Sequence, residues 1–353
     1  MPNTDLRNAN KAKQDEFYTS LTDIEKELRF YKKFFKNKTV YCNCDDPRVS
    51  SFFHYFSEQF ENLKLKKLIT TCYKNKNLDL FSKNDSERAI YLEYNGDKNG
   101  NSVPDLEEIG INELKGDGDF RSEECIELLK KADIVVTNPP FSLFIPYVQQ
   151  LLKYKKKFLI IGRLTAFSYK DIFPLLKNNL MWVGPSIHSG DREFGVPKNY
   201  ELRSKSQRID ENGNRFISVS GVRWFTNINY KEKIDDIVLY KKYNKTDYPK
   251  YENYNAINVN KTKEIPKDYA GHMGVPITFF DKYNPEQFEI IGLGIAGLGL
   301  EMGVKPYKKE HKKYRKEVQK RAAVDGDLYF AKENGEIEVP FSRIIIRNKK
   351  LTK

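Results

Sequence analysis

Short apolar runs that alternate with segments of helical periodicity limit the fold of this chain more than any other feature. Residues 134–136 (Ile-Val-Val) and 158–161 (Phe-Leu-Ile-Ile) contain no polar side chain, which is typical of strands covered on both faces. Segments of helical periodicity lie before and after each run. Strands that alternate with helices are joined by crossovers, so the sequence predicts an α/β fold with a mainly parallel sheet and helices on both faces.

The alternation extends over the first two thirds of the chain. We expect helices at 15–36, 47–63, 122–131, 143–154 and 169–178, and strands at 39–44, 67–72, 89–94, 133–137, 157–162, 181–184 and 216–227. After about residue 230 the pattern fades, so we predict two domains, 1–230 and 231–353. The glycine-rich stretch 292–303 has no Lys-Ser or Lys-Thr at the offset of a phosphate loop. We interpret this stretch as a tight, flexible connection to a basic helix.

The chain is strongly basic. Its 353 residues carry a net charge of +12, from 61 lysines and arginines against 49 aspartates and glutamates. A surplus of this size favours a polyanionic partner. Residues 305–321 alone hold nine basic and two acidic residues. This segment is either an element that contacts phosphates or a solvated helix face.

The sequence also predicts where the chain works and what it does not bind. No run of about 18 apolar residues occurs, so we expect no membrane span. The N-terminus lacks the pattern of a secretory signal, and the four cysteines are then expected in a reduced, cytoplasmic setting. Cys42 and Cys44 form a Cys-x-Cys pair. No second pair lies nearby and the four histidines are scattered, so we expect no metal.

One motif carries the chemistry. Residues 133–144 read DIVVTNPPFSLF, so Asn138 follows the carboxyl end of an apolar strand. Sheets of this kind bind ligands at the carboxyl ends of their strands. Pro139 and Pro140 remove two backbone donors and fix φ, and a residue before proline is held extended. The expected result is a rigid loop that offers exposed carbonyls, one side-chain amide and the ring of Phe141.

These groups suit methylation of an aromatic amine. The lone pair of such an amine is delocalised into its ring, which makes the amine a poor nucleophile. The Asn138 side-chain oxygen and the Pro139 carbonyl can accept hydrogen bonds from its two N–H groups, and Phe141 can stack on the base. The reaction then depends on positioning and electrostatics, and a base in duplex DNA must first be extruded. The alternative is a surface Asn-Pro-Pro turn without chemical meaning.

The chain resembles the EcoRI-type adenine-specific DNA methyltransferases. The resembling stretches are DEFYT (15–19), VYCNCDDPRVS (40–50), GDGDFRS (116–122), DIVVTNPPFSLF (133–144), YNAINVNKTKEIP (254–266) and MGVPITFFDKYNPEQFEI (273–290). The resemblance implies a Rossmann-like class I methyltransferase with a mixed sheet, and a smaller C-terminal target-recognition region at 231–353. It also implies transfer of a methyl group from S-adenosylmethionine to N6 of a flipped-out adenine in duplex DNA, with S-adenosylhomocysteine as product. The enzyme would serve a type II restriction-modification system with a cognate restriction endonuclease, and a GAATTC-like site follows from resemblance alone.

The resemblance also implies a set of cofactor residues. Phe17, Tyr18 and Thr19 correspond to the motif beside the methionine end of the cofactor, although Phe17 and Tyr18 can also be read as core aromatics. Asp119 and Phe120 correspond to the acid and ring that bind its adenine, with Asp117 shaping the loop, although Asp119 can also be read as a turn residue. The first strand carries no glycine where the common pattern has them. The residues at this position are Cys42, Asn43, Asp45 and Asp46, and either aspartate can pair with the cofactor's ammonium group or ribose. Asn138 borders the same pocket.

The order of motifs is similar to the class whose target-recognition domain is C-terminal. Candidate phosphate contacts are the basic residues of that region, namely Lys261, Lys263, Lys312, Lys313, Arg315, Lys316, Lys320 and Arg321. For any one of them a solvated surface charge is the competing interpretation.

Two other classes of function remain open. Methyltransferases that act on release-factor glutamine or on RNA bases also use Asn-Pro-Pro-aromatic loops. The long basic region after the sheet favours DNA over these substrates. A binding protein on an inactive methyltransferase fold is the second alternative, and the intact Asn138, Pro139, Phe141 and Asp119 argue against it.

Overall fold

A computed structural model describes residues 17–44, 50–71, 89–101, 104, 108–187, 190–196, 207–230 and 235–351. The chain divides into two compact units. The first unit comprises Met1–Arg163 and Trp182–Tyr230, and the second comprises Leu164–Met181 and Lys231–Lys353. The second unit thus takes in a segment, 164–181, that the sequence pattern groups with the first two thirds of the chain.

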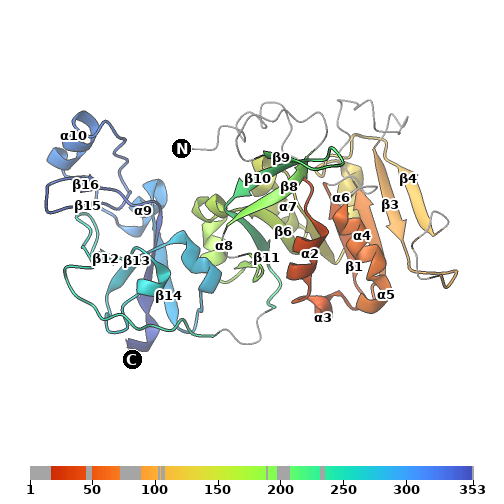
Figure 1. The fold of residues 1–353 in the computed structure, drawn as a ribbon, viewed down its shortest axis with the longest axis horizontal. Coiled ribbons are helices and arrows are strands. Elements are labelled where there is room, and N and C mark those ends of the chain that lie inside the picture. Colours follow the sequence, from red (N-terminus) through yellow and green to blue (C-terminus); the bar gives the residue numbers. More distant parts are fainter. Residues whose placement is uncertain are drawn as a thin grey trace. The chain divides into compact units, whose positions relative to one another are not determined.

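An eight-stranded mixed sheet forms the centre of the first unit (Figure 1). Its strand order is β4-β3-β2-β1-β5-β6-β11-β7. The strands are β1 (Thr39–Asn43), β2 (Lys67–Thr71), β3 (Ile90–Tyr94), β4 (Ile109–Glu113), β5 (Ile134–Thr137), β6 (Lys157–Arg163), β7 (Trp182–Val183) and β11 (Val222–Thr226). The four central strands, β2, β1, β5 and β6, are parallel, and the outer strands pair antiparallel. The predicted α/β fold is therefore confirmed.

Helices cover both faces of this sheet. One face packs against α2 (Leu21–Leu28), α4 (Ser51–Glu58) and α5 (Phe60–Leu63), whose buried side chains share a core with Val40 and Leu68. The other face packs against α6 (Glu123–Lys131) and α7 (Phe144–Lys153), where the Phe144 ring lies 5.0 Å from that of Phe225. A short α3 (Lys32–Phe35) follows α2. Serine caps begin α2, α4 and α6, because Ser20, Ser50 and Ser122 accept hydrogen bonds from first-turn amides.

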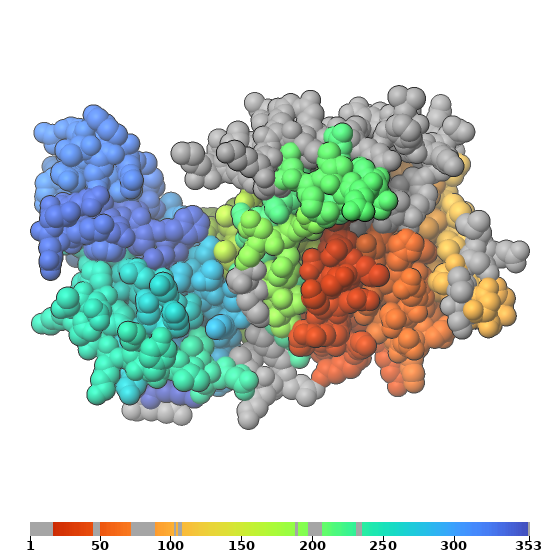
Figure 2. Space-filling model, in the orientation of Figure 1, coloured from red at the N-terminus to blue at the C-terminus, as the bar shows by residue number. Residues whose placement is uncertain are grey.

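The strand expected at 216–227 is two strands. Gly221, with φ +67°, separates β10 (Arg215–Ser220) from β11. A positive φ strongly favours glycine, so the chain turns here and the two strands enter different sheets. β10 lies between β8 (Asp191–Val196) and β9 (Gln207–Ile209) in a three-stranded antiparallel sheet. This sheet lies at the surface of the first unit and is green in Figure 2.

The second unit is built around a four-stranded sheet of order β12-β13-β17-β14. The strands are β12 (Ala256–Asn258), β13 (His272–Pro276), β14 (Phe288–Gly294) and β17 (Arg343–Asn348). Its helices are α8 (Phe173–Lys177), α9 (Ala296–Met302) and α10 (Lys309–Glu317), and β15 (Phe330–Ala331) pairs with β16 (Ile337–Glu338). Short 3-10 turns complete the described chain: η1 (Phe141–Leu143), η2 (Leu164–Ser168), η3 (Thr262–Glu264), η4 (Ile277–Lys282) and η5 (Lys349–Leu351).

The glycine-rich stretch 292–303 is regular structure, so its interpretation as a flexible connection was wrong. It forms the end of β14 and all of α9. Its glycines serve close packing, because a Cβ on Gly292 would collide with Met302 and one on Gly294 with Leu328. A Cβ on Gly299 would strike the carbonyl oxygen of Gly326. The basic helix expected after this stretch is present as α10.

Candidate active site

The loop of residues 138–141, called here the NPPF loop, leaves the carboxyl end of the central strand β5. Asn138 is 4% exposed. Its Nδ2 donates a hydrogen bond to the backbone carbonyl of Phe17 at 2.7 Å. Its Oδ1 is buried and has no hydrogen-bond partner among the described residues. The amide is thus oriented through its donor, and its acceptor is left for a group from outside the described residues.

Three aromatic rings pack together next to the NPPF loop. The Phe141 ring lies 5.5 Å from Phe17 and 6.4 Å from Phe194 of β8, and Phe17 lies 6.0 Å from Phe194, in edge or tilted arrangements. Tyr18 forms a two-hydrogen-bond bridge with Gly195 at 2.9 and 3.0 Å, which fixes the N-terminal motif against β8. An apolar wall beside a polar acceptor is the arrangement that a planar heterocyclic amine requires.

The end of β1 is tied to the end of β5. These neighbouring strands are parallel, so their carboxyl ends lie at the same sheet edge. The Thr137 hydroxyl donates to the backbone carbonyl of Asn43, and the Tyr147 hydroxyl of α7 donates to the Asn43 side-chain oxygen. The next residue, Cys44, has φ +80°. A non-glycine residue rarely adopts this conformation, so the bonds to Asn43 hold a strained turn at the position where glycines are common.

The predicted adenine-binding residues lie beside the same helix. The Phe120 ring is 6% exposed and lies edge-on to Tyr147, with centroids 4.9 Å apart. Its backbone carbonyl accepts a hydrogen bond from Gln150 Nε2 at 2.8 Å. The Asp119 carboxylate accepts from the Arg121 side chain at 2.9 and 2.6 Å, and Asp117 Oδ1 accepts from the Asp119 amide at 3.1 Å. Phe120 and Asn43 are therefore held through two side chains of α7.

Further polar atoms near these strand ends have no partner among the described residues. They are the hydroxyls of Thr19 and Thr70, both deeply buried. Thr70 lies on β2 opposite Cys42 of β1. Unsatisfied buried hydroxyls are costly unless a ligand or water completes them. Each of these hydroxyls therefore leaves a place for a polar group of a ligand or for a water.

The structure brings together most of the predicted site residues of the first unit. Phe17, Tyr18, Asn138 and Phe141 are in one cluster, and Asn43, Thr137, Tyr147 and Phe120 are in a second that adjoins it through Thr137 and Asn138. Asp45 and Asp46 lie outside the described residues. Sequence reasoning missed Tyr147, Thr137, Thr70 and Phe194. The only signal for Tyr147 was its place on the apolar stripe of its helix, which predicts burial and no partner.

The predicted phosphate contacts of the second unit differ in their surroundings. Lys312 is paired with Asp325 at 2.6 Å, and this ion pair holds the pKa of the Asp325 carboxyl below its usual value. Arg315 is 9% exposed and donates to the backbone carbonyls of Ala322 and Ile337. Its guanidinium therefore stabilises the small core around α10. The exposed members of the set are Lys261, Lys263, Lys313, Lys316, Lys320 and Arg321.

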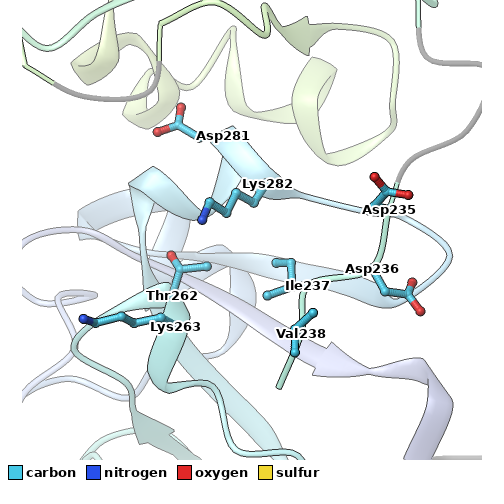
Figure 3. Close-up of a pocket in the computed structure, with 8 residues that line it drawn as sticks. All are labelled: Asp235, Asp236, Ile237, Val238, Thr262, Lys263, Asp281 and Lys282. Carbon is cyan, nitrogen blue, oxygen red and sulfur yellow. The ribbon is translucent and has the colours of Figure 1, made fainter. Parts of the chain in front are cut away.

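A pocket of about 410 Å³ lies in the second unit. Figure 3 shows Thr262, Lys263 and Lys282 on one side of it and Asp235 and Asp236 on the other. Its lining has charges of both signs. None of its residues belongs to the clusters around Asn138 and Asn43.

In the described part of the chain, no group of three or more His, Cys, Asp or Glu side chains is arranged to hold a metal ion. No helix in the same residues is long and apolar enough to cross a membrane.

The fold and the NPPF loop define the class of protein. A mixed sheet of this order, with helices on both faces, is that of a Rossmann-like methyltransferase. Residues 5–349 match the family model described as "Adenine-specific methyltransferase EcoRI". The chain therefore belongs to the EcoRI adenine-specific methyltransferase family.

Individual relatives agree with this assignment. The chain is 48% identical over 350 residues to the type II methyltransferase M.EcoRI of Escherichia coli. The aligned residues are 99% of this chain and 97% of the relative. It is 41% identical over 288 residues to M.MgeORF184P of Mycoplasma genitalium, covering 80% of this chain and 84% of the relative. It is 40% identical over 287 residues to M.MpnI of Mycoplasma pneumoniae, covering 80% and 83%. No solved structure matches the chain.

Proposed function

We propose that the protein transfers a methyl group from S-adenosylmethionine to N6 of an adenine extruded from duplex DNA, as the modification enzyme of a type II restriction-modification system. The observation that carries the proposal is the Asn138 amide, whose Nδ2 is bound to the Phe17 carbonyl while its buried Oδ1 has no partner among the described residues. An amine that enters this site meets an acceptor already oriented toward it.

The chain's own residues then position the amine. Asn138 Oδ1 accepts one N–H of N6 and the Pro139 carbonyl accepts the other, which leaves the nitrogen lone pair free to point out of the base plane. Phe141 stacks on the purine, and the Phe17 and Phe194 rings keep water away from it. Fixed acceptors that need no reorganisation are an efficient source of rate enhancement.

The cofactor supplies a methyl group activated on a sulfonium, so the site needs no metal and no covalent nucleophile. We assign its adenosine to Asp119 and Phe120, with Asp117 shaping their loop. We assign its amino-acid end to Thr19 and the end of β1, where Cys42 and Asn43 lie. The buried hydroxyls of Thr19 and Thr70 support this assignment, because both need a partner from outside the described residues.

We assign target recognition to the second unit. Its exposed cations are Lys261, Lys263, Lys313, Lys316, Lys320 and Arg321. Lys261 and Lys313 make long, exposed ion pairs at 3.9 Å with Glu264 and Glu317, which a DNA phosphate can replace, whereas Lys312 and Arg315 are held more closely within the unit. The enzyme would act on cytoplasmic DNA, and its partner in biology would be an endonuclease that cuts the same sequence when it is unmethylated.

Methylome sequencing of a bacterial host that lacks adenine methylation tests the proposal. A host that expresses this chain should carry N6-methyladenine within one sequence context, and the same host with an empty vector should carry none. Unmethylated genomic DNA together with methylated RNA or protein would refute the assignment to DNA. The experiment also reports the recognition sequence, including whether it is GAATTC.

A further inference from the structure

The three-stranded sheet β8-β10-β9 has one face turned toward the protein interior. Side chains alternate along a strand, so Arg192, Phe194 and Val196 of β8 share a face. Their partners in register on β10 are Val219, Ile217 and Arg215. Phe194, Val196 and Val219 are 2%, 7% and 3% exposed, so this is the inner face. Arg192 therefore lies on the inner face and is partly buried there.

This inner face meets the NPPF loop. Phe194 contacts both Phe141 and Phe17, and Gly195 is bridged to Tyr18. Arg192 is two residues from Phe194 on the same face, a spacing of roughly 7 Å along a strand. A guanidinium is long enough to reach the surroundings of a base stacked on Phe141.

The guanidinium of Arg192 lacks a hydrogen-bond acceptor for one of its N–H groups among the described residues. Its Nε is buried and has no hydrogen-bond partner among the described residues. Arg208 on the opposite face of the same sheet differs, because its Nε and NH2 bind the Glu193 carboxylate at 3.0 and 2.7 Å. A buried guanidinium N–H without an acceptor is costly, and a planar fork of donors matches the oxygens of a phosphate.

We propose that Arg192 binds a DNA phosphate adjoining the extruded adenine and so stabilises the extruded nucleotide. This inference rests on the proposed function. Extrusion rotates a nucleotide about its backbone, which moves the flanking phosphates together with the base toward the protein. Phe141 holds the base, and Arg192 supplies the cation for the backbone beside it.

The test compares Arg192→Ala, Arg192→Lys and the matched control Arg208→Ala with the parent protein. The duplex carries the sequence found by methylome sequencing, with 2-aminopurine at the target adenine. We expect Arg192→Ala to lower duplex affinity by about tenfold to hundredfold. The slope of log affinity against log salt should fall by about 0.9, the value for one phosphate. The fluorescence rise that reports base extrusion should also shrink.

The two other variants separate the effect of the Arg192 fork from that of its charge and from the loss of any arginine on this sheet. Arg192→Lys keeps the charge and loses the fork, so its salt slope should stay near that of the parent while the extrusion signal falls. Arg208→Ala should match the parent in both readouts. S-adenosylmethionine affinity, measured by calorimetry, should be unchanged in all three variants, which shows that the cofactor pocket is folded.

The inference is overturned if Arg192→Ala keeps the parent's salt slope and extrusion signal, or if Arg208→Ala loses as much as Arg192→Ala. A parent protein that neither methylates the same duplex with adenine at the target position nor raises the 2-aminopurine signal would instead refute the proposed function. The two failures are therefore distinguishable.

Discussion

At the scale of single residues, the site depends on a few side chains that hydrogen-bond to more than one structural element. Asn43 is the clearest case, because its backbone accepts from Thr137 and its side chain accepts from Tyr147. The same Tyr147 ring supports Phe120. One buried side chain of α7 thus connects the turn after β1 with the ring assigned to the cofactor's adenine.

Replacing Tyr147 by phenylalanine should weaken cofactor binding while the fold is kept. The ring contact with Phe120 remains, but Asn43 Oδ1 loses its donor, at a cost of about 1–3 kcal/mol. We expect the Kd for S-adenosylmethionine to rise about tenfold or more, with kcat at saturating cofactor close to that of the parent. Tyr154→Phe, at the end of the same helix, is the matched control and should leave the Kd unchanged. An unaltered Kd in Tyr147→Phe would contradict this role.

At the scale of elements, a buried carboxyl joins α2 to the segment after β7. Glu27 accepts hydrogen bonds from the Tyr31 hydroxyl at 2.8 Å and from the Ser186 amide at 2.9 Å, and it is fully buried. Burial raises the pKa of Glu27 from 4.5 to about 7. Gly184 makes room for it, since a Cβ there would collide with the Glu27 carboxylate.

This raised pKa predicts how stability varies with pH. Below pH 4.5 the carboxyl is protonated in both states. Between pH 4.5 and 7 the unfolded chain releases its proton first, so this group's contribution to folding is lost as pH rises, by about 3 kcal/mol in total. Glu27→Gln is neutral throughout and its amide can donate to the Tyr31 hydroxyl. Above pH 7 it should unfold at higher urea concentration than the parent, and near pH 4.5 it should match the parent.

Urea unfolding curves from pH 4.5 to 8 check this prediction. Glu25→Gln, on the exposed side of the same helix, is the control and should follow the parent at every pH. If the difference between Glu27→Gln and the parent did not change across this range, Glu27 would not be the titrating group.

At the scale of the whole molecule, the features that could be predicted from the sequence are those that depend on residues close together in the chain. The α/β fold was predicted from the apolar runs at β5 and β6 and from the helical periodicity around them, and the structure confirms it. The family was predicted from the motifs, and the comparisons with known proteins confirm it. Two prolines and a preceding strand predicted a rigid loop with exposed carbonyls after β5. The structure instead buries Asn138 and Pro139, and the Pro140 carbonyl accepts a hydrogen bond from the Leu143 amide.

Non-local pairing was beyond sequence reasoning. The second unit's sheet joins β13 to β17 through pairs such as Gly274 with Ile345, and no local pattern specifies a partner some 70 residues away. The glycines of 292–303 were misread because close packing against Leu328 and Gly326 is visible only in three dimensions. Charge counting likewise could not separate Arg315, which is buried against carbonyls, from the exposed Lys313 and Lys316.

The central claim is that the NPPF loop grips an adenine amine through Asn138, and single-turnover methyl transfer by Asn138→Ala tests it most directly. Asn62→Ala, an exposed change in the same unit, is the control. The account predicts that Asn138→Ala binds duplex DNA as the parent does, yet at saturating S-adenosylmethionine transfers the methyl group at least about a hundredfold more slowly. A rate close to that of the parent, with both ligands bound, would contradict the account.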